Sequence, residues 1–155
     1  MRYCFALLLS TGAFAQQADL QTATLEELLQ VQVTTASRKA QPLSRVPAAM
    51  HVITQDDIRR SGATSLPELL RWVPGLEVAQ IDSNKWAINA RGFNSRFSNK
   101  MLVLQDGRSL YATDFSGVFW DNQDTFLEDI ERIEIIRGPG ATMWGANAVN
   151  GVISY

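Results

Sequence analysis

The chain has 155 residues, of which 46% are hydrophobic and 19% are charged, and its formal net charge is −2. This length suits one ordinary domain with a hydrophobic core of its own. A slightly acidic chain offers no basic patch for nucleic acid, so these values exclude a typical nucleic-acid-binding protein.

Residues 1–15 have the pattern of a cleavable secretory signal peptide. A basic residue and an apolar run precede the Ala13-Phe14-Ala15 cleavage pattern, which predicts cleavage before Gln16. A short buried helix is the alternative, but a Ser-Thr-Gly sequence interrupts the apolar run. No stretch of the chain reaches the roughly 18 apolar residues of a transmembrane helix. We therefore expect export, and the loss of Cys4, the only cysteine, with the signal.

Residues 16–41 form a predicted N-terminal arm. Thr24 and Glu27 have the spacing of a capping box, which predicts a short helix at the start of the arm. Residues 31–39 alternate and are rich in β-branched side chains, but they lack the bulk of a core strand. We expect this second part to be extended and mobile, although a plain linker would have the same composition.

The pattern becomes that of a globular domain from Pro42 onward. Residues 50–53 predict a strand, and the Thr-Gln-Asp-Asp sequence after it caps a helix that ends near Gly62. A second helix begins near Ser65 and ends before Pro74. Its apolar face consists of Leu66, Leu69, Leu70 and Val73.

Short strands and turns make up the rest of the chain. Strands are expected over residues 76–79, 86–91, 101–104, 108–111 and 130–136. Asp106-Gly107 is a turn signal that joins the third and fourth of these strands into a hairpin. A helical turn over 124–129 precedes the last strand, and a glycine-rich stretch covers 138–151. We therefore expect a small α+β (mixed α/β) domain with a mixed sheet of about four strands, short helices and long loops.

Residue types that carry catalysis occur without their usual companions. The single histidine, His51, has no cysteine or second histidine with which to share a metal. The glycine spacing at 140–145 resembles a P-loop, but the required Lys and Ser/Thr are absent. Glu131 and Glu134 flank an arginine on a predicted strand, which favours a solvated face over a glycosidase pair. We predict no catalytic residue, no metal site and no cofactor.

Five motifs, in order, resemble the plug domain of TonB-dependent outer-membrane receptors. They are Val46-Pro-Ala-Ala-Met-His-Val-Ile-Thr-Gln-Asp-Asp-Ile-Arg-Arg-Ser-Gly62, Leu69-Leu-Arg-Trp-Val-Pro-Gly-Leu-Glu-Val78, Ile88-Asn-Ala-Arg-Gly-Phe93, Val103-Leu-Gln-Asp-Gly-Arg108 and Arg137-Gly-Pro-Gly-Ala-Thr-Met-Trp-Gly-Ala-Asn-Ala-Val-Asn-Gly-Val-Ile153. Any one of them is a weak signal. Together they cover nearly all of 42–153, and the predicted signal peptide agrees with them.

The resemblance implies a role for several charged and small residues. In that family the plug fills a roughly 22-stranded barrel. Arg91 and Arg137 match the plug arginines that pair with barrel glutamates and lock the plug in place, a task that suits the planar guanidinium. Ordinary surface arginines are the alternative. Glycines that permit close backbone approach or positive φ are expected at Gly92, Gly107, Gly138, Gly140, Gly145 and Gly151.

The resemblance also implies two binding partners. The extended arm fits the TonB box, a periplasmic segment that TonB, with ExbB and ExbD, captures by strand addition. Its residues here are Val31, Gln32, Val33, Thr34, Thr35 and Ala36. Ligands such as iron-siderophore complexes or cobalamin bind outward-facing plug loops. By position these loops offer Arg96, Phe97, Phe115, Phe119 and Trp120, which could equally pack against a barrel wall.

A barrel of this size needs roughly 220 residues, but only Ser154 and Tyr155 follow the last motif. We expect a fragment or a truncated gene product, in the outer membrane when the receptor is intact and in the periplasm when this chain is alone. A free periplasmic binding module of plug-like fold is the alternative. A secreted hydrolase would require His51 or a carboxylate pair.

Overall fold

The computed structural model describes residues 31–35, 38–46 and 48–155. The predicted signal peptide, the helix expected near Thr24 and the position of Ala36 lie outside these ranges. Within them, no helix is long and apolar enough to cross a membrane.

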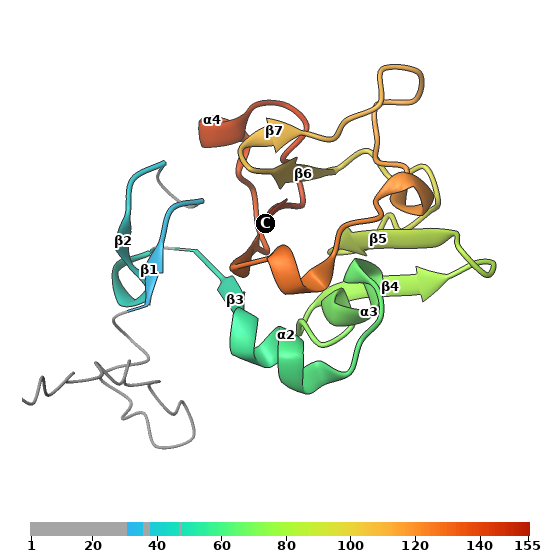
Figure 1. The fold of residues 1–155 in the computed structure, drawn as a ribbon. Coiled ribbons are helices and arrows are strands. Elements are labelled where there is room, and N and C mark those ends of the chain that lie inside the picture. Colours follow the sequence, from blue (N-terminus) through green and yellow to red (C-terminus); the bar gives the residue numbers. More distant parts are fainter. Residues whose placement is uncertain (1–30, 36–37, 47) are drawn as a thin grey trace, which may run out of the picture.

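A five-stranded mixed sheet forms the centre of the domain (Figure 1). In spatial order its strands are β3 (Met50–Thr54), β8 (Arg132–Ile136), β9 (Gly151–Ser154), β6 (Met101–Gln105) and β7 (Arg108–Ser109). The β6 and β9 strands are parallel, and the other neighbours are antiparallel. This mixed sheet with short helices confirms the predicted α+β fold class.

Two short helices follow β3, and local side chains set their ends. The first, α2 (Gln55–Ser61), has a capping box in which Thr54 and Asp57 each satisfy the backbone N–H of the other. It ends at Gly62, whose φ of 67° is left-handed. The second, α3 (Leu66–Leu70), lacks a side-chain cap at Ser65. Instead, Glu68 accepts a hydrogen bond from the backbone N–H of Thr64 at 2.8 Å.

Two small sheets flank the central one. In the first, β4 (Leu76–Gln80) pairs with β5 (Trp86–Ala90) as an antiparallel hairpin. In the second, β1 (Gln32–Val33) pairs with β2 (Gln41–Pro42). The remaining short elements are η1 (Leu43–Arg45), η2 (Trp120–Asn122), η3 (Leu127–Asp129) and α4 (Ala141–Trp144). The helical turn predicted over 124–129 is the single turn of η3.

The predicted turn at Asp106-Gly107 joins β6 to β7. Its two central residues have φ angles of 49° and 78°, the two positive values that a tight hairpin turn of this hand requires. The second strand is shorter than the sequence predicted, because only Arg108 and Ser109 pair with β6.

Side chains alternate between two faces of the central sheet. The core face carries Ile53, Val103, Ile133, Ile135 and Ile153, which pack with α2, α3, β5 and the loops into the main apolar cluster. The opposite face, called here the arm face, carries Leu102, Leu104, Glu134, Ile136 and Val152. Apart from Glu134, these residues form a smaller apolar cluster with Ala148. The sheet thus separates a large apolar core from a smaller, partly polar layer.

Candidate functional site

The segment predicted to be a mobile arm is packed against the domain. Gln32 and Val33 form the short strand β1, whereas Thr35 lies in a turn; Val33 and Thr35 are both buried. The β1–β2 pairing turns this segment into a small hairpin beside β3 (Figure 1). The composition of the segment does not indicate this packing, because the side chains that bind the segment lie far away in the sequence.

Glu134 in β8 is the main one of those side chains. Glu134 is only 3% exposed. Its carboxylate accepts hydrogen bonds from the backbone N–H of Thr34 at 3.0 Å and from that of Thr35 at 2.8 Å. The Nε of Arg132 donates to the other carboxylate oxygen at 3.0 Å. A buried carboxylate is stable only when opposite charge and N–H donors satisfy it. Glu134 is therefore satisfied jointly by its own strand and by the arm.

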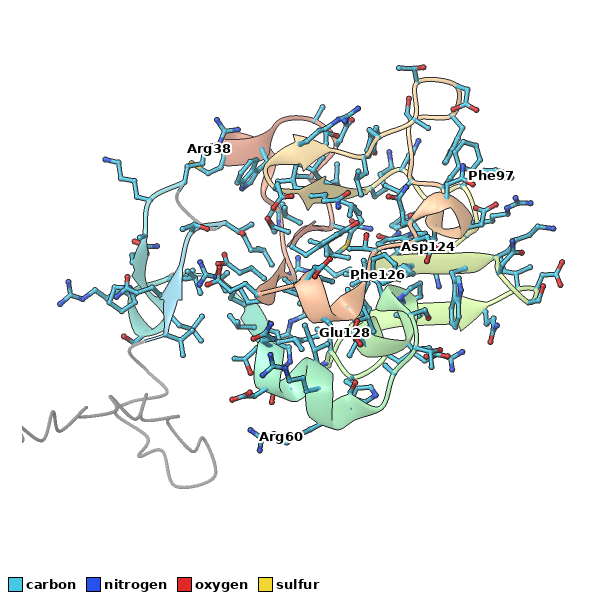
Figure 2. All side chains as sticks on the ribbon, in the orientation of Figure 1. Arg38, Arg60, Phe97, Asp124, Phe126 and Glu128 are labelled. Atoms are coloured by element: carbon cyan, nitrogen blue, oxygen red, sulfur yellow. The ribbon has the colours of Figure 1, made fainter. Side chains whose placement is uncertain are left out.

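Trp144 in α4 provides a second contact to the arm. Its indole Nε1 donates to the carbonyl oxygen of Thr35 at 2.7 Å. The guanidinium of Arg38, which precedes β2 in the sequence, lies 4.4 Å from the centre of the Trp144 ring. Figure 2 shows Arg38 beside α4. Both the N–H and the C=O of Thr35 are thus bonded to side chains of the domain.

The two arginines predicted to lock a barrel lie together at one corner. Arg137 directly follows β8, and its Nη1 donates to the carbonyl oxygen of Pro74. Arg91 directly follows β5, and its Nη2 donates to the carbonyl oxygen of Arg137 at 3.3 Å. The Nε of Arg137 is buried without a hydrogen-bond partner. Neither guanidinium has a carboxylate within ion-pair distance among the described residues.

A buried asparagine fixes the chain next to Arg91, and the sequence analysis missed its role. The Asn89 side chain is fully buried and donates to the carbonyls of Gly92 and Phe93, both at 3.0 Å. Its oxygen accepts a bond from Asn150 at 3.3 Å. These bonds hold Arg91 in a left-handed conformation, with a φ of 59°. In the sequence, the glycine after Arg91 was the signal that could have predicted a turn at this position.

The glycines singled out in the sequence fall into two groups. Gly92, Gly107 and Gly145 have positive φ angles. Gly138, Gly140 and Gly151 have negative φ angles but lie close to other groups. Gly151 is the most constrained, because a Cβ atom there would overlap the carbonyl oxygen of Ile136 on β8. Only glycine allows β9 to pair closely with β8 at that point.

An aromatic cluster lies on the loops where ligand contacts were predicted. Phe115 contacts Phe97 and Phe119, with ring centres 5.1 and 4.5 Å away, respectively. Arg96 lies over the Phe97 ring, and its guanidinium is 3.7 Å from the Asp121 carboxylate. Figure 2 shows Phe97, which is 53% exposed, on the opposite side of the domain from Arg38.

Trp120 does not share that exposed position. It is 7% exposed and belongs to the main apolar cluster on the core face. Its prediction as a ligand-facing residue was wrong for this conformation, because η2 turns the indole inward. The structure therefore separates the buried Trp120 from Phe115 and Phe119, which are half-buried in the aromatic cluster.

Two clefts open on the surface. The larger, of about 670 Å³, runs from the arm to the C-terminal strand and is mainly acidic. Its charged lining consists of Asp106, Asp124, Asp129, Glu131, Arg132 and Glu134. The smaller, of about 310 Å³, lies between β3 and the two helices and includes His51, Asp57 and Trp72. No group of three potential metal ligands occurs in the part of the chain described.

His51 is the titratable group on the core side of β3. Burial, and then the positive charge of Arg137, lower the pKa of His51 below its ordinary value of 6.5, and Asp57 partly opposes this shift. The neutral imidazole is therefore the favoured form in the folded chain. The charged groups that act on its pKa, Arg137 and Asp57, do not form a catalytic arrangement with it.

Comparison with known proteins gives one family. The model described as TonB-dependent Receptor Plug Domain matches residues 42–152. The chain is 37% identical over 124 residues to the vitamin B12 transporter BtuB of Vibrio vulnificus, which covers 79% of this chain and 20% of that protein. It is 32% identical over 156 residues to the iron-regulated outer membrane virulence protein of Vibrio cholerae, with coverage of 96% and 22%.

A solved structure has the same fold. FpvA of P. aeruginosa, bound to a heterologous pyoverdine and iron, matches with a TM-score of 0.61 at 20% identity. The match covers 79% of this chain and 16% of FpvA. The chain spans about a fifth of the length of the curated relatives it matches.

Proposed function

Because the chain belongs to the family of TonB-dependent receptor plug domains, we propose that it gates a TonB-dependent outer-membrane transporter and senses that transporter's ligand. The family is one of receptors and not of enzymes. The observation that carries the proposal is the family match over nearly the whole globular part, together with the fold shared with a siderophore-bound receptor.

The cargo in this proposal is a scarce nutrient such as an iron-siderophore complex or cobalamin. One relative is named as a vitamin B12 transporter, and FpvA was solved with an iron-pyoverdine complex. The exposed Phe97, its aromatic neighbours and Arg96 suit a large chelate that has both apolar and negatively charged surface. Ligand binding on these loops would be the signal that the plug transmits.

The arginine corner is proposed to bind the surrounding barrel. The Arg91 guanidinium lies against the backbone of Arg137. No carboxylate in the described part of the chain is within ion-pair distance of either guanidinium. Carboxylates of a barrel wall would supply both the charge and the bidentate geometry that arginine prefers.

The arm is proposed to be the segment that TonB captures. Residues 31–36 are rich in Val and Thr, and Gln32 and Val33 form a strand in the structure. A strand of this kind can add to the edge of a partner's sheet through its backbone groups. Tension on the arm, powered by the inner-membrane proton gradient through ExbB and ExbD, would then remodel the plug.

A binding experiment with the TonB C-terminal domain tests this function. We expect the chain without its signal peptide to be retained by immobilised TonB, and the same chain lacking residues 31–36 to be lost. Deletion of residues 18–23, which has the same length, is the matched control and should leave binding unchanged. Equal retention with and without 31–36 would refute the arm assignment, and no retention of either would refute TonB coupling.

A further inference from the structure

We propose that Asn89 is a positioning residue that gives the ligand-facing loop and the arginine corner one fixed relative geometry. The loop meant here is 94–99, which carries the exposed Phe97. The arginine corner is Arg91 together with Arg137. The proposal rests on the functions proposed above for these two regions, and it adds the residue that sets their geometry. Asn89 acts through the turn that joins the two regions, and not by touching a ligand or a barrel.

The turn between these two regions is strained. Arg91, Gly92 and Phe93 are consecutive residues with left-handed φ angles of 59°, 81° and 61°. In residues other than glycine this conformation brings Cβ close to the following carbonyl oxygen, so two of the three residues adopt it at a cost in free energy. Burial does not offset the cost at Phe93, which is 80% exposed. Such backbone persists only where its surroundings hold it, and it is typical of functional sites.

Asn89 holds the turn with both hydrogens of its side-chain amide. Its Nδ2 donates to the carbonyl oxygens of Gly92 and Phe93, each at 3.0 Å. Its Oδ1 accepts the backbone N–H of Ala90 at 2.9 Å and the side-chain Nδ2 of Asn150 at 3.3 Å. Both donors and both acceptor positions of this fully buried amide are therefore used. Another arrangement of the turn would leave some of these buried polar atoms unpaired, which is costly.

Two further side chains fasten the turn to the β4–β5 hairpin. Glu77, the cross-strand partner of Asn89, accepts the backbone N–H of Gly92 at 2.9 Å. Asn94, the first residue of the loop, donates to the carbonyl oxygens of Glu77 and Ala87, at 3.2 and 3.3 Å. The start of the loop is therefore fixed to both strands of the hairpin.

The same amide network reaches the far end of the loop and the arginine corner. Asn150, which is 7% exposed, bonds Asn89 through its side chain, and its backbone N–H donates to the carbonyl oxygen of Lys100 at 2.8 Å. Lys100 directly follows the loop. Arg91, the first residue of the turn, donates to the carbonyl oxygen of Arg137 at 3.3 Å. Both ends of the loop and one side of the corner thus depend on the position of Asn89.

Hydrogen exchange of the Gly92 amide in the whole chain tests the proposal without ligand, barrel or TonB. This amide bonds Glu77 and not Asn89, so it reports whether the turn keeps its shape. Asn89→Asp keeps both acceptor bonds but replaces the two donors with an oxygen that faces the two carbonyls. We expect the Gly92 amide to exchange about tenfold faster or more, because both bonds to the turn are lost. Amides of β6 and β9 should exchange as before.

Asn99→Asp is the matched control. It makes the same chemical change in the same loop, at an exposed residue that contributes its backbone carbonyl, and not its side chain, to a hydrogen bond with Tyr111. Exchange of the Gly92 amide should be unchanged in this variant. No acceleration in Asn89→Asp, or equal acceleration in both variants, would overturn the proposal.

Asn89→Ala covers the case in which Asn89→Asp also accelerates exchange in β6 and β9. It removes the same two donors without placing a charge beside the carbonyls of the turn. The Gly92 amide must then exchange a few-fold faster or more, while β6 and β9 stay protected. If the Gly92 amide does not respond separately from the sheet, the positioning role is refuted.

A glycine at position 93 distinguishes the holding of a strained turn from simple packing. Glycine adopts a positive φ without the cost that a side chain brings, and the exposed Phe93 contributes little packing. Phe93→Gly added to Asn89→Asp should therefore slow exchange of the Gly92 amide by a few-fold, back toward the parent rate. A packing defect at Asn89 would not be repaired in this way. Unchanged or faster exchange in the double variant would contradict the proposal.

These results and those of the TonB binding experiment are independent of each other. Accelerated Gly92 exchange with rescue by glycine, in a chain that immobilised TonB does not retain, keeps the positioning role and refutes TonB coupling. Retention by TonB together with unchanged Gly92 exchange in Asn89→Asp keeps the proposed function and refutes the positioning role.

Discussion

The two faces of the central sheet are held by different kinds of interaction. On the core face, Ile133, Ile135 and Ile153 are fully buried in one apolar cluster. On the arm face, Glu134 and Trp144 bind the backbone of the arm through hydrogen bonds. Apolar burial has no direction and no specific competitor, whereas a backbone N–H can be taken over by another strand. The core face is thus suited to permanent packing and the arm face to an exchangeable contact.

Substitution on the core face should have the largest effect on stability. Ile135→Ala leaves a cavity in the middle of the main cluster, so we expect the free energy of unfolding to fall by about 2–5 kcal/mol. Val149→Ala, at an exposed position, is the control and should change it by less than about 0.5 kcal/mol. Denaturant titration measures both. A similar small loss for the two variants would contradict the assignment of the core.

Substitution on the arm face should have a smaller and more local effect. Glu134→Ala removes the acceptor for Thr34 and Thr35, so we expect a loss of about 1–3 kcal/mol. The arm can then leave while the core stays folded, which limits the loss. Denaturant titration measures the change, and tryptic cleavage after Arg38 or Lys39 reports arm release. A loss as large as that of Ile135→Ala, without faster cleavage, would show that Glu134 belongs to the permanent core.

The smallest expected effect is the pH dependence from His51 at the edge of the core face. Its pKa is lowered in the folded chain, first by burial and then by Arg137. The unfolded chain therefore takes up the proton more readily, so stability is complete above pH of about 6.5 and declines as the pH falls toward the lower folded-state pKa. His51→Gln should abolish this decline. Denaturant unfolding at a series of pH values across this range measures the free energy of unfolding. An increase in the stability of the parent chain on acidification would contradict the account.

Local sequence signals predicted most of the fold. The Thr54–Asp57 capping box, the apolar face of α3 and the Asp106-Gly107 turn each depend on residues within a few positions of one another. The strand β9 begins at Gly151, the last residue of the glycine-rich stretch, and was not predicted, because Gly151 is required by contact with β8 and not by its own propensity. Composition alone therefore gave no strand signal at the start of this central strand.

The candidate site was predictable only in part, for the same reason. The resemblance drew attention to the arm and to both arginines, which lie at positions where such roles are possible. It did not indicate that Glu134, read as part of a solvated face, is buried against Thr34 and Thr35, which lie about one hundred positions away. No local pattern connects such distant segments. The same limit explains the buried Asn89 and the inward Trp120.

The reactivity of a single thiol on the arm tests most directly whether Glu134 holds the arm on the sheet. Thr35→Cys places a thiol at a buried arm position, and the only natural cysteine, Cys4, lies in the predicted signal peptide. We predict that this thiol is protected in the parent background and in Arg137→Gln, and that it reacts about tenfold faster or more in Glu134→Gln. Equal reactivity in all three backgrounds would contradict the account, because the arm would then be held by something other than Glu134.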